Sequence, residues 1–309
     1  MPWDTLKLSD GTEIPSIAYG TGSLGKGQGT VDKVDQAISV GFNHIDTAQL
    51  YRNEEEAGVA LRESGLKRED VYITTKYSGV GGLDIATSIQ NSLKNLGVKY
   101  VDLYLIHNPR IVPDIPPAWK AMEKVKADGL AKNIGVSNFT VPQLTILLAS
   151  AKVKPAANQI RFHPYVLAEQ TPVLEFSSKN GIIIEAYSPL TPLTRQPGGP
   201  VDAPVKKIAD RLKAAPEQVL LAWAKAKGTV VVTTSSNKQR LESYLDAGDL
   251  ELTSDDIAAI DAAGISGARY VAVRTFIKRA ATAALIGAVS LSFCKYLGAD
   301  LPSTMFPYL

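Results

Sequence analysis

The chain has 309 residues, of which 45% are hydrophobic, and its formal net charge is +2. This length allows two average domains or one large α/β barrel with a sizeable core. The balanced charge gives no support to nucleic acid as a partner. The single cysteine, Cys294, excludes an internal disulfide framework and a thiolate metal cluster. The start, MPWDTLKLSD, has no basic segment or apolar run, so we expect no signal peptide and a reducing, cytoplasmic location.

Short apolar runs alternate with amphipathic stretches along most of the chain. Residues 4–15 alternate around Asp10-Gly11, which predicts a β-hairpin. The runs expected to form strands after it are 16–20, 42–46, 71–76, 101–107, 131–137, 156–160, 182–188 and 229–234. Strands and helices that alternate in this way predict parallel strands with crossover helices. We therefore expect an α/β fold, a closed (β/α)₈ TIM barrel with an N-terminal β-hairpin and a C-terminal apolar helix, whose site lies at the carboxyl ends of the strands.

A glycine motif offers an alternative fold. Residues 20–25, GTGSLG, match G-x-G-x-x-G after a predicted strand, and Asp46 follows about 20 residues later, as in a Rossmann dehydrogenase. In that fold the third glycine opens a helix. Here GKGQG follows, so the helix is expected to begin only at Thr30, which would cap it. The eight strand–helix repeats also favour the barrel.

Four polar residues fall at the expected ends of neighbouring strands. Asp46 ends the second strand, Lys76 the third and His107 the fourth, and Tyr51 follows the second. A buried ammonium favours a nearby phenolate, so Lys76 is expected to lower the pKa of Tyr51 from about 10. Asp46 would hold Lys76 in place. His107 would donate a hydrogen bond to a carbonyl oxygen, which Tyr51 would protonate.

This group suits carbonyl reduction by a hydride donor, and it offers no nucleophile–base pair and no metal site. Each residue alone is better explained by structure, as a buried ion pair, a helix-flanking aromatic or a strand-end histidine. The four together favour a catalytic site. His44, two residues before Asp46 and deeper in the same strand, is expected to be a packed core residue.

Several motifs occur in the order found in one known family. GFNHIDTAQLY, TTKY, LYLIHNP, IGVSNF, NQIRFHPY and IEAYSPL resemble the aldo-keto reductases across residues 4–263. AYGTGS and VVVTTSSNKQRLESYL are most similar to the fungal branch that reduces α-keto amides and conjugated polyketones. The resemblance implies a (β/α)₈ barrel that binds NADPH without a Rossmann fold, with Tyr51 as proton donor and a small-molecule carbonyl substrate. We expect a monomer.

The resemblance also implies a cofactor site. Ser137, Asn138 and Gln159 would hold the carboxamide of the nicotinamide, and Tyr187 would stack on its ring. His107 and Asn108 would contact the substrate. The residues expected to bind the cofactor are Gly20, Thr21, Asp46, Ser137, Asn138, Gln159, Tyr187, Ser188, Leu190, Thr234, Ser235, Ser236, Asn237 and Arg240.

The sequence departs from the pattern of the family in three respects. Thr234 stands where a lysine often pairs with the 2′-phosphate, which weakens the preference for NADPH over NADH, although the guanidinium of Arg240 can still bind phosphate. Asn108 replaces a common tryptophan, and a second pocket aromatic is absent from GTGSLG, so a wider mouth and bulky ketone substrates are expected. Ser243 and Tyr244 replace an acid and an amide that often hold adenine. Tyr244 is expected to be a packed helix residue, with stacking on adenine as the alternative.

The resemblance ends near residue 263. We expect a barrel domain of residues 1–270 and a C-terminal tail of residues 271–309, in which 280–294 carry no charge. The segment 278–297 begins with two basic residues and is expected to anchor the protein to an intracellular membrane. A buried helix, or a C-terminal loop that closes over the substrate pocket, is the alternative.

The sequence thus predicts an NADPH-dependent reductase of a ketone or aldehyde, with NADH as the alternative cofactor. A cofactor-binding regulatory subunit with little turnover and an aldose reductase are the alternative functions. The intact group of four residues argues against a pure binder, because binding alone has no need of Tyr51.

Overall fold

A computed structural model describes residues 3–296, and the side chains of 278–279 and 281–296 lie outside this description. Eight parallel strands form a closed barrel in the order β10-β3-β4-β5-β6-β7-β8-β9. They are β3 (Ile17–Gly20), β4 (His44–Asp46), β5 (Tyr72–Tyr77), β6 (Val101–Ile106), β7 (Ala131–Ser137), β8 (Ala157–Arg161), β9 (Ile183–Tyr187) and β10 (Val230–Thr233). The barrel closes where β10 pairs with β3. The predicted TIM barrel is confirmed, and the Rossmann alternative is excluded.

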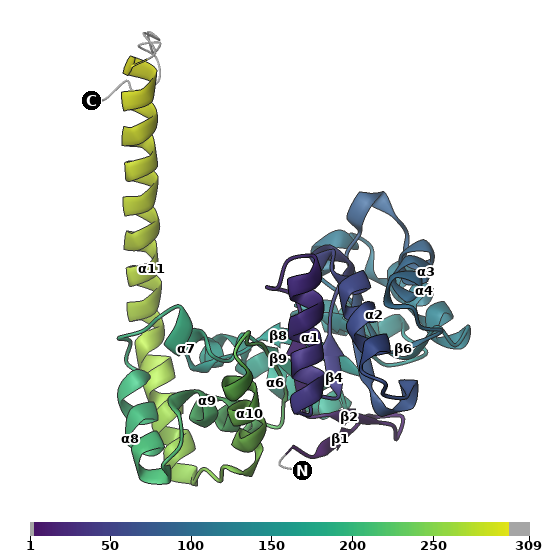
Figure 1. The fold of residues 1–309 in the computed structure, drawn as a ribbon, viewed down its shortest axis with the longest axis horizontal. Helices are drawn as coiled ribbons and strands as arrows, with labels where there is room; N and C mark the ends of the chain where they lie inside the picture. The colour runs from purple at the N-terminus through teal and green to yellow at the C-terminus, as the bar shows by residue number, and fades with distance from the viewer. Residues whose placement is uncertain (1–2, 297–309) are drawn as a thin grey trace.

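The helices surround the barrel (Figure 1) and bury their apolar faces against its strands. The α-helices are α1 (Gln28–Val40), α2 (Glu54–Glu63), α3 (Ile85–Leu96), α4 (Ile115–Ala127), α5 (Val141–Ser150), α6 (Leu167–Asn180), α7 (Thr191–Thr194), α8 (Asp202–Leu212), α9 (Pro216–Ala226), α10 (Lys238–Asp246) and α11 (Ser254–Tyr296). The 3₁₀-helices are η1 (Gln49–Tyr51), η2 (Arg68–Asp70), η3 (Val80–Gly82), η4 (Pro109–Ile111), η5 (Pro164–Val166) and η6 (Ala247–Asp249).

The N-terminal hairpin closes the amino end of the barrel. Its strands β1 (Thr5–Lys7) and β2 (Glu13–Pro15) pair in antiparallel fashion, as predicted. Leu8 and Ile14 are buried in one apolar cluster with Leu103 and Leu105, which come from β6. The hairpin therefore covers the amino end of the barrel, opposite the carboxyl ends of the strands where barrel sites lie.

The loop between β3 and α1 differs from its expected form. The expectation that α1 begins at Thr30 was wrong, because the helix begins at Gln28. Gly27 precedes it with a φ of 85°, a value that glycine adopts readily. Thr30 is not the cap, since its Oγ1 donates to the carbonyl of Leu24 at 3.1 Å. The glycine motif 20–25 therefore lies at the strand end and in the following loop, before the helix.

Helix α11 extends far beyond the rest of the molecule (Figure 1). Its first part packs against η5, α8 and α6, and it continues without a break across the expected domain boundary at residues 270–271. Within the part of the chain that the structure describes, no helix combines the length and apolar character that a bilayer crossing requires. The side chains of nearly all of the expected anchor, 278–297, lie outside the described residues.

Candidate active site

A cavity of about 680 Å³ opens at the carboxyl ends of the strands. This volume lies in the usual range for small-molecule and cofactor sites, about 300–1,000 Å³. The residues expected from the sequence that line it are Gly20, Asp46, Tyr51, His107, Ser137, Asn138, Gln159, Tyr187, Ser188, Leu190, Thr234, Ser235, Ser236 and Arg240. The strand ends thus bring most of the expected residues to one cavity, as convergence in a closed barrel requires.

Four of the expected residues do not line the cavity: Lys76 lies beneath it, and the other three hold nearby loops. Thr21 is buried, and its Oγ1 donates to Thr47 Oγ1 at 2.9 Å. The side-chain oxygen of Asn108 accepts from the backbone N–H of Arg110 at 3.0 Å and caps η4. Asn237 caps α10 in the same way. Asn108 and Asn237 are thus bonded to the backbone and Thr21 to the side chains of Thr47 and Asn53, which the sequence motifs do not reveal.

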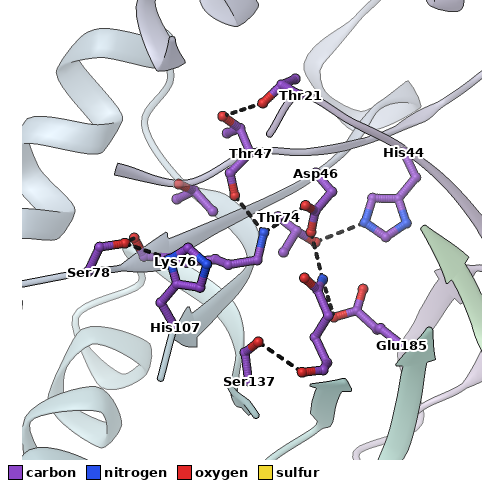
Figure 2. A network of polar contacts seen from close by, with 12 residues as sticks. Thr21, His44, Asp46, Thr47, Thr74, Lys76, Ser78, His107, Ser137 and Glu185 are labelled. Carbon is purple, nitrogen blue, oxygen red and sulfur yellow. Dashed lines mark hydrogen bonds and ion pairs between the residues drawn. The ribbon is translucent and has the colours of Figure 1, made fainter. Parts of the chain in front are cut away.

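Lys76 lies beneath the cavity, fully buried, in a network of polar contacts (Figure 2). Its Nζ donates to Asp46 Oδ1 at 2.6 Å and to the carbonyl of Thr47 at 2.8 Å. Burial lowers the pKa of Lys76, but Asp46 and Tyr51 oppose this effect and raise the pKa above its ordinary value. The ammonium therefore stays charged, 5.2 Å from the centre of the Tyr51 ring.

Tyr51 lies at the end of η1 with its ring against Gly22. A Cβ placed on Gly22 would lie 3.1 Å from the ring carbon Cζ of Tyr51, so a larger residue would displace the phenol. Burial raises the pKa of Tyr51 and Lys76 lowers it, and burial outweighs the ammonium. Lys76 thus lowers this pKa as expected, but the net shift is upward, because the sequence does not show how deeply the phenol is buried.

His107 stands at right angles to the phenol. The two ring centres are 5.5 Å apart and the planes meet at 84°. Burial and the charge of Lys76 lower the pKa of His107 to about 4, so its imidazole is neutral near pH 7. Ser78 Oγ lies 2.8 Å from His107 Nδ1. With this hydroxyl as donor, the ring proton is on Nε2, which leaves an N–H for a ligand oxygen.

Side-chain amides and hydroxyls form a second polar group on the opposite wall. Ser137 Oγ donates to the carbonyl of Gln159 at 2.8 Å, and Asn138 Nδ2 donates to Ser137 Oγ at 3.0 Å. The hydroxyl of Tyr187 donates to Asn138 Oδ1 at 3.0 Å. Gln159 Nε2 donates to Asp46 Oδ2 at 2.7 Å, which connects this wall to the buried ion pair.

The sequence reasoning missed Glu185, which is fully buried in β9. Its Oε2 lies 3.3 Å from Gln159 Nε2, while its Oε1 has no hydrogen-bond partner among the described residues. Burial and the nearby Asp46 raise the pKa of Glu185 to about 8. The alternation of strand residues could have revealed it, because Glu185 is two positions before Tyr187 and faces the same side.

The cavity also contains cations that the sequence reasoning did not single out. Lys33 of α1 and Arg195, which follows α7, line it together with Arg240. Within the described chain, none of these three side chains forms an ion pair. Uncompensated positive charge beside serine and threonine hydroxyls suits the phosphates of a dinucleotide. The residues present therefore fit a nicotinamide dinucleotide, which Arg195 and Arg240 would hold.

Tyr244 has both a packing role and a place in the cavity. It is buried in α10, where its carbonyl accepts from Trp3 Nε1 at 3.0 Å. Tyr244 also borders the cavity. The expectation that it packs within the protein is confirmed, and part of its surface remains available to a ligand.

Comparison with known proteins gives the class of this chain. The sequence profile of the Aldo/keto reductase family matches residues 16–265. The chain is 39% identical over 281 residues to the NAD/NADP-dependent indole-3-acetaldehyde reductase of Schizosaccharomyces pombe, covering 87% of this chain and 96% of that protein. It is 36% identical over 287 residues to the NADPH-dependent alpha-keto amide reductase of Saccharomyces cerevisiae, covering 84% of this chain and 90% of that protein.

Solved structures agree with this result. An aldo/keto reductase from Brucella melitensis superposes with a TM-score of 0.77 at 35% identity, covering 84% of this chain and 99% of that one. The Bombyx mori aldo-keto reductase in complex with NADP gives a TM-score of 0.77 at 32% identity, covering 84% and 92%. The chain belongs to the aldo/keto reductase family. It is an NAD(P)H-dependent oxidoreductase that reduces carbonyl groups.

Proposed function

We propose that this enzyme reduces a bulky ketone of the α-keto or polyketone type with NADPH, and that Tyr51 is the proton donor. The observation that carries the catalytic part is the Lys76 ammonium, which is paired with Asp46 and lies 5.2 Å from the ring of Tyr51. This arrangement stabilises a phenolate at the moment when the phenol gives up its proton.

The other groups at the site have separate roles in the proposed reaction. The chemistry that a bound reduced nicotinamide would supply is a hydride for the carbonyl carbon. His107 donates a hydrogen bond from Nε2 to the carbonyl oxygen and positions the substrate. Tyr51 gives its proton to that oxygen as negative charge develops there. The phenolate left behind faces the ammonium of Lys76, so the charge is stabilised within the buried site.

The proposed substrate class rests on the absence of two aromatic side chains at the mouth of the cavity. Asn108 occupies the position of a frequent tryptophan and caps η4, and it does not border the cavity. Without that ring, and without an aromatic in the loop after β3, we expect the mouth of the cavity to admit a larger substrate. The names of two relatives bear on this reading: an alpha-keto amide reductase fits the α-keto class, whereas an indole-3-acetaldehyde reductase is named for a bulky aldehyde and not for a ketone. The first supports placing this chain near the fungal α-keto amide and polyketone branch.

The test is a comparison of kcat/KM for a bulky α-dicarbonyl compound and for xylose, with oxidation of NADPH followed by absorbance. We expect a clear preference for the dicarbonyl, and a preference for xylose would favour the aldose reductase alternative. The same assay with NADH measures cofactor preference, for which we propose NADPH. Absence of turnover with every carbonyl, despite cofactor binding, would favour a regulatory subunit.

We also propose that the C-terminal segment 271–309, whose first residues continue helix α11, attaches the protein to an intracellular membrane. The support is the uncharged sequence 280–294 beyond the end of the family match at residue 265. Carbonate extraction of cell membranes tests this proposal. Retention of the full chain in the membrane fraction, and release of a chain that ends at residue 270, is expected. Release of both would contradict the proposal.

A further inference from the structure

Helix α1 contributes an unpaired cation to the cavity. Lys33 is half-buried and borders the same cavity as Arg240 and Tyr244 of α10. Helices α1 and α10 pack against each other, because β10 and β3 are neighbours where the barrel closes. Two helices that are far apart in the sequence thus each bring a positive side chain to the cavity.

No acid neutralises Lys33 within its own helix. The positions three and four residues away are Gly29, Thr30, Gln36 and Ala37, so the usual helical ion pairs cannot form. Within the described chain Lys33 makes no ion pair with another element either. A half-buried ammonium without a partner in a ligand cavity favours an anionic ligand.

We propose that Lys33 binds the 2′-phosphate of NADPH together with Arg240, and that it replaces the lysine missing at position 234. This inference rests on the proposed preference for NADPH. Ser235 and Ser236 border the same cavity and offer hydroxyl donors. The 2′-phosphate distinguishes NADPH from NADH, so Lys33 is a residue that determines cofactor specificity.

The alternative is that Lys33 contacts the pyrophosphate, which both cofactors carry. The two roles predict different results when Lys33 is changed to a neutral side chain of similar length. A contact with the 2′-phosphate affects NADP⁺ and leaves NAD⁺ unaffected, whereas a contact with the pyrophosphate weakens both cofactors to the same extent.

Isothermal titration of the full chain with NADP⁺ and with NAD⁺ tests the proposal without turnover. We expect Lys33→Gln to raise the Kd for NADP⁺ about 10-fold, the value of one charge-assisted hydrogen bond. The Kd for NAD⁺ should change by less than about 2-fold. The matched control is Lys26→Gln, an exposed lysine in the loop before α1 that does not border the cavity, and it should leave both Kd values unchanged.

A second variant tests whether the positive charge itself is responsible. Lys33→Gln combined with Thr234→Lys should recover most of the affinity for NADP⁺, because it returns a cation to the cavity. Equal losses for both cofactors in Lys33→Gln, or no loss for either, would overturn the proposal. A wild-type enzyme that binds NAD⁺ as tightly as NADP⁺ would instead overturn the proposed cofactor preference on which it rests, before any variant is measured.

Discussion

Lys76 Nζ and Asp46 Oδ1 lie 2.6 Å apart at the bottom of the cavity, and both side chains are almost completely removed from solvent. A buried pair of this kind does not stabilise a fold strongly by itself, because both charges lose their hydration. The ion pair contributes to the reaction, because it keeps a positive charge fixed beneath Tyr51. The same burial makes the loss of one partner costly.

Lys76→Met should therefore destabilise the protein by about 3–5 kcal/mol, because it leaves the Asp46 carboxylate buried without its countercharge. Unfolding in urea measures this cost. The control is Lys206, which forms an ion pair with Asp210 on the surface. The side chain of Lys206 is 72% exposed and that of Asp210 is 66% exposed. Lys206→Met should cost about 0–1 kcal/mol, as exposed pairs do. Similar costs for the two variants would contradict the buried charge pair.

Glu185 should make the stability of the protein decrease between neutral and mildly alkaline pH. Its pKa is raised from an ordinary value of 4.5 to about 8. The folded protein therefore keeps a proton that the unfolded chain releases, and stability falls as pH rises through this window. The three histidines have the opposite effect, because their pKa values are lowered to about 4 and their contribution grows between about pH 4 and 6.5.

The interval from pH 6.5 to 8 isolates Glu185, and over it the free energy of unfolding should fall by about 1–2 kcal/mol. Glu185→Gln should remove this fall, while Glu63→Gln, an exposed substitution on α2, should keep it. Urea unfolding at several pH values provides the measurement. A curve for Glu185→Gln that matches the wild type would show that this carboxyl does not hold the proton.

Helix α11 holds the loop that borders the cavity after β9. Gln196 Nε2 donates to Thr275 Oγ1 at 3.0 Å, and Arg274 Nη1 donates to the carbonyl of Pro197 at 2.8 Å. The loop just before these contacts includes Arg195, which borders the cavity. The segment of α11 that makes the contacts lies beyond the end of the family match at residue 265.

Removal of these contacts should speed the release of the cofactor, because loop movement commonly controls ligand release. We expect Arg274→Met combined with Thr275→Val to raise the dissociation rate of NADP⁺ roughly 2- to 10-fold, as measured by stopped-flow displacement. Arg269→Met, an exposed change on the same helix, serves as control. Equal rates in the two variants would show that α11 does not restrain the loop.

The barrel could be predicted from the sequence because each buried parallel strand is a short apolar run followed by an amphipathic helix. The grouping of Asp46, Lys76 and His107 followed from their positions at strand ends, which a closed barrel brings together. The start of α1 was missed by two residues, because Gly27 adopts a positive φ that the run of glycines did not locate.

Other features depend on packing that no local pattern shows. Lys33 reaches the cavity only because α1 packs beside α10, so its role is not visible in its own helix. The direction of the pKa shift of Tyr51 depends on how burial compares with the pull of Lys76. Glu185 lies in the motif IEAYSPL, in which only Tyr187 and the residues after it were considered as site residues. The environment of Glu185 is formed by Gln159 and Asp46, which come from other strands.

Replacement of Tyr51 by phenylalanine tests the central claim most directly, because it removes one hydroxyl and keeps the ring against Gly22. We expect kcat for a bulky dicarbonyl to fall by about 10²–10⁴-fold, the usual contribution of a proton donor, with the Kd for NADP⁺ unchanged. A variant that binds NADP⁺ normally and retains close to wild-type kcat would contradict the assignment of Tyr51 as the proton donor.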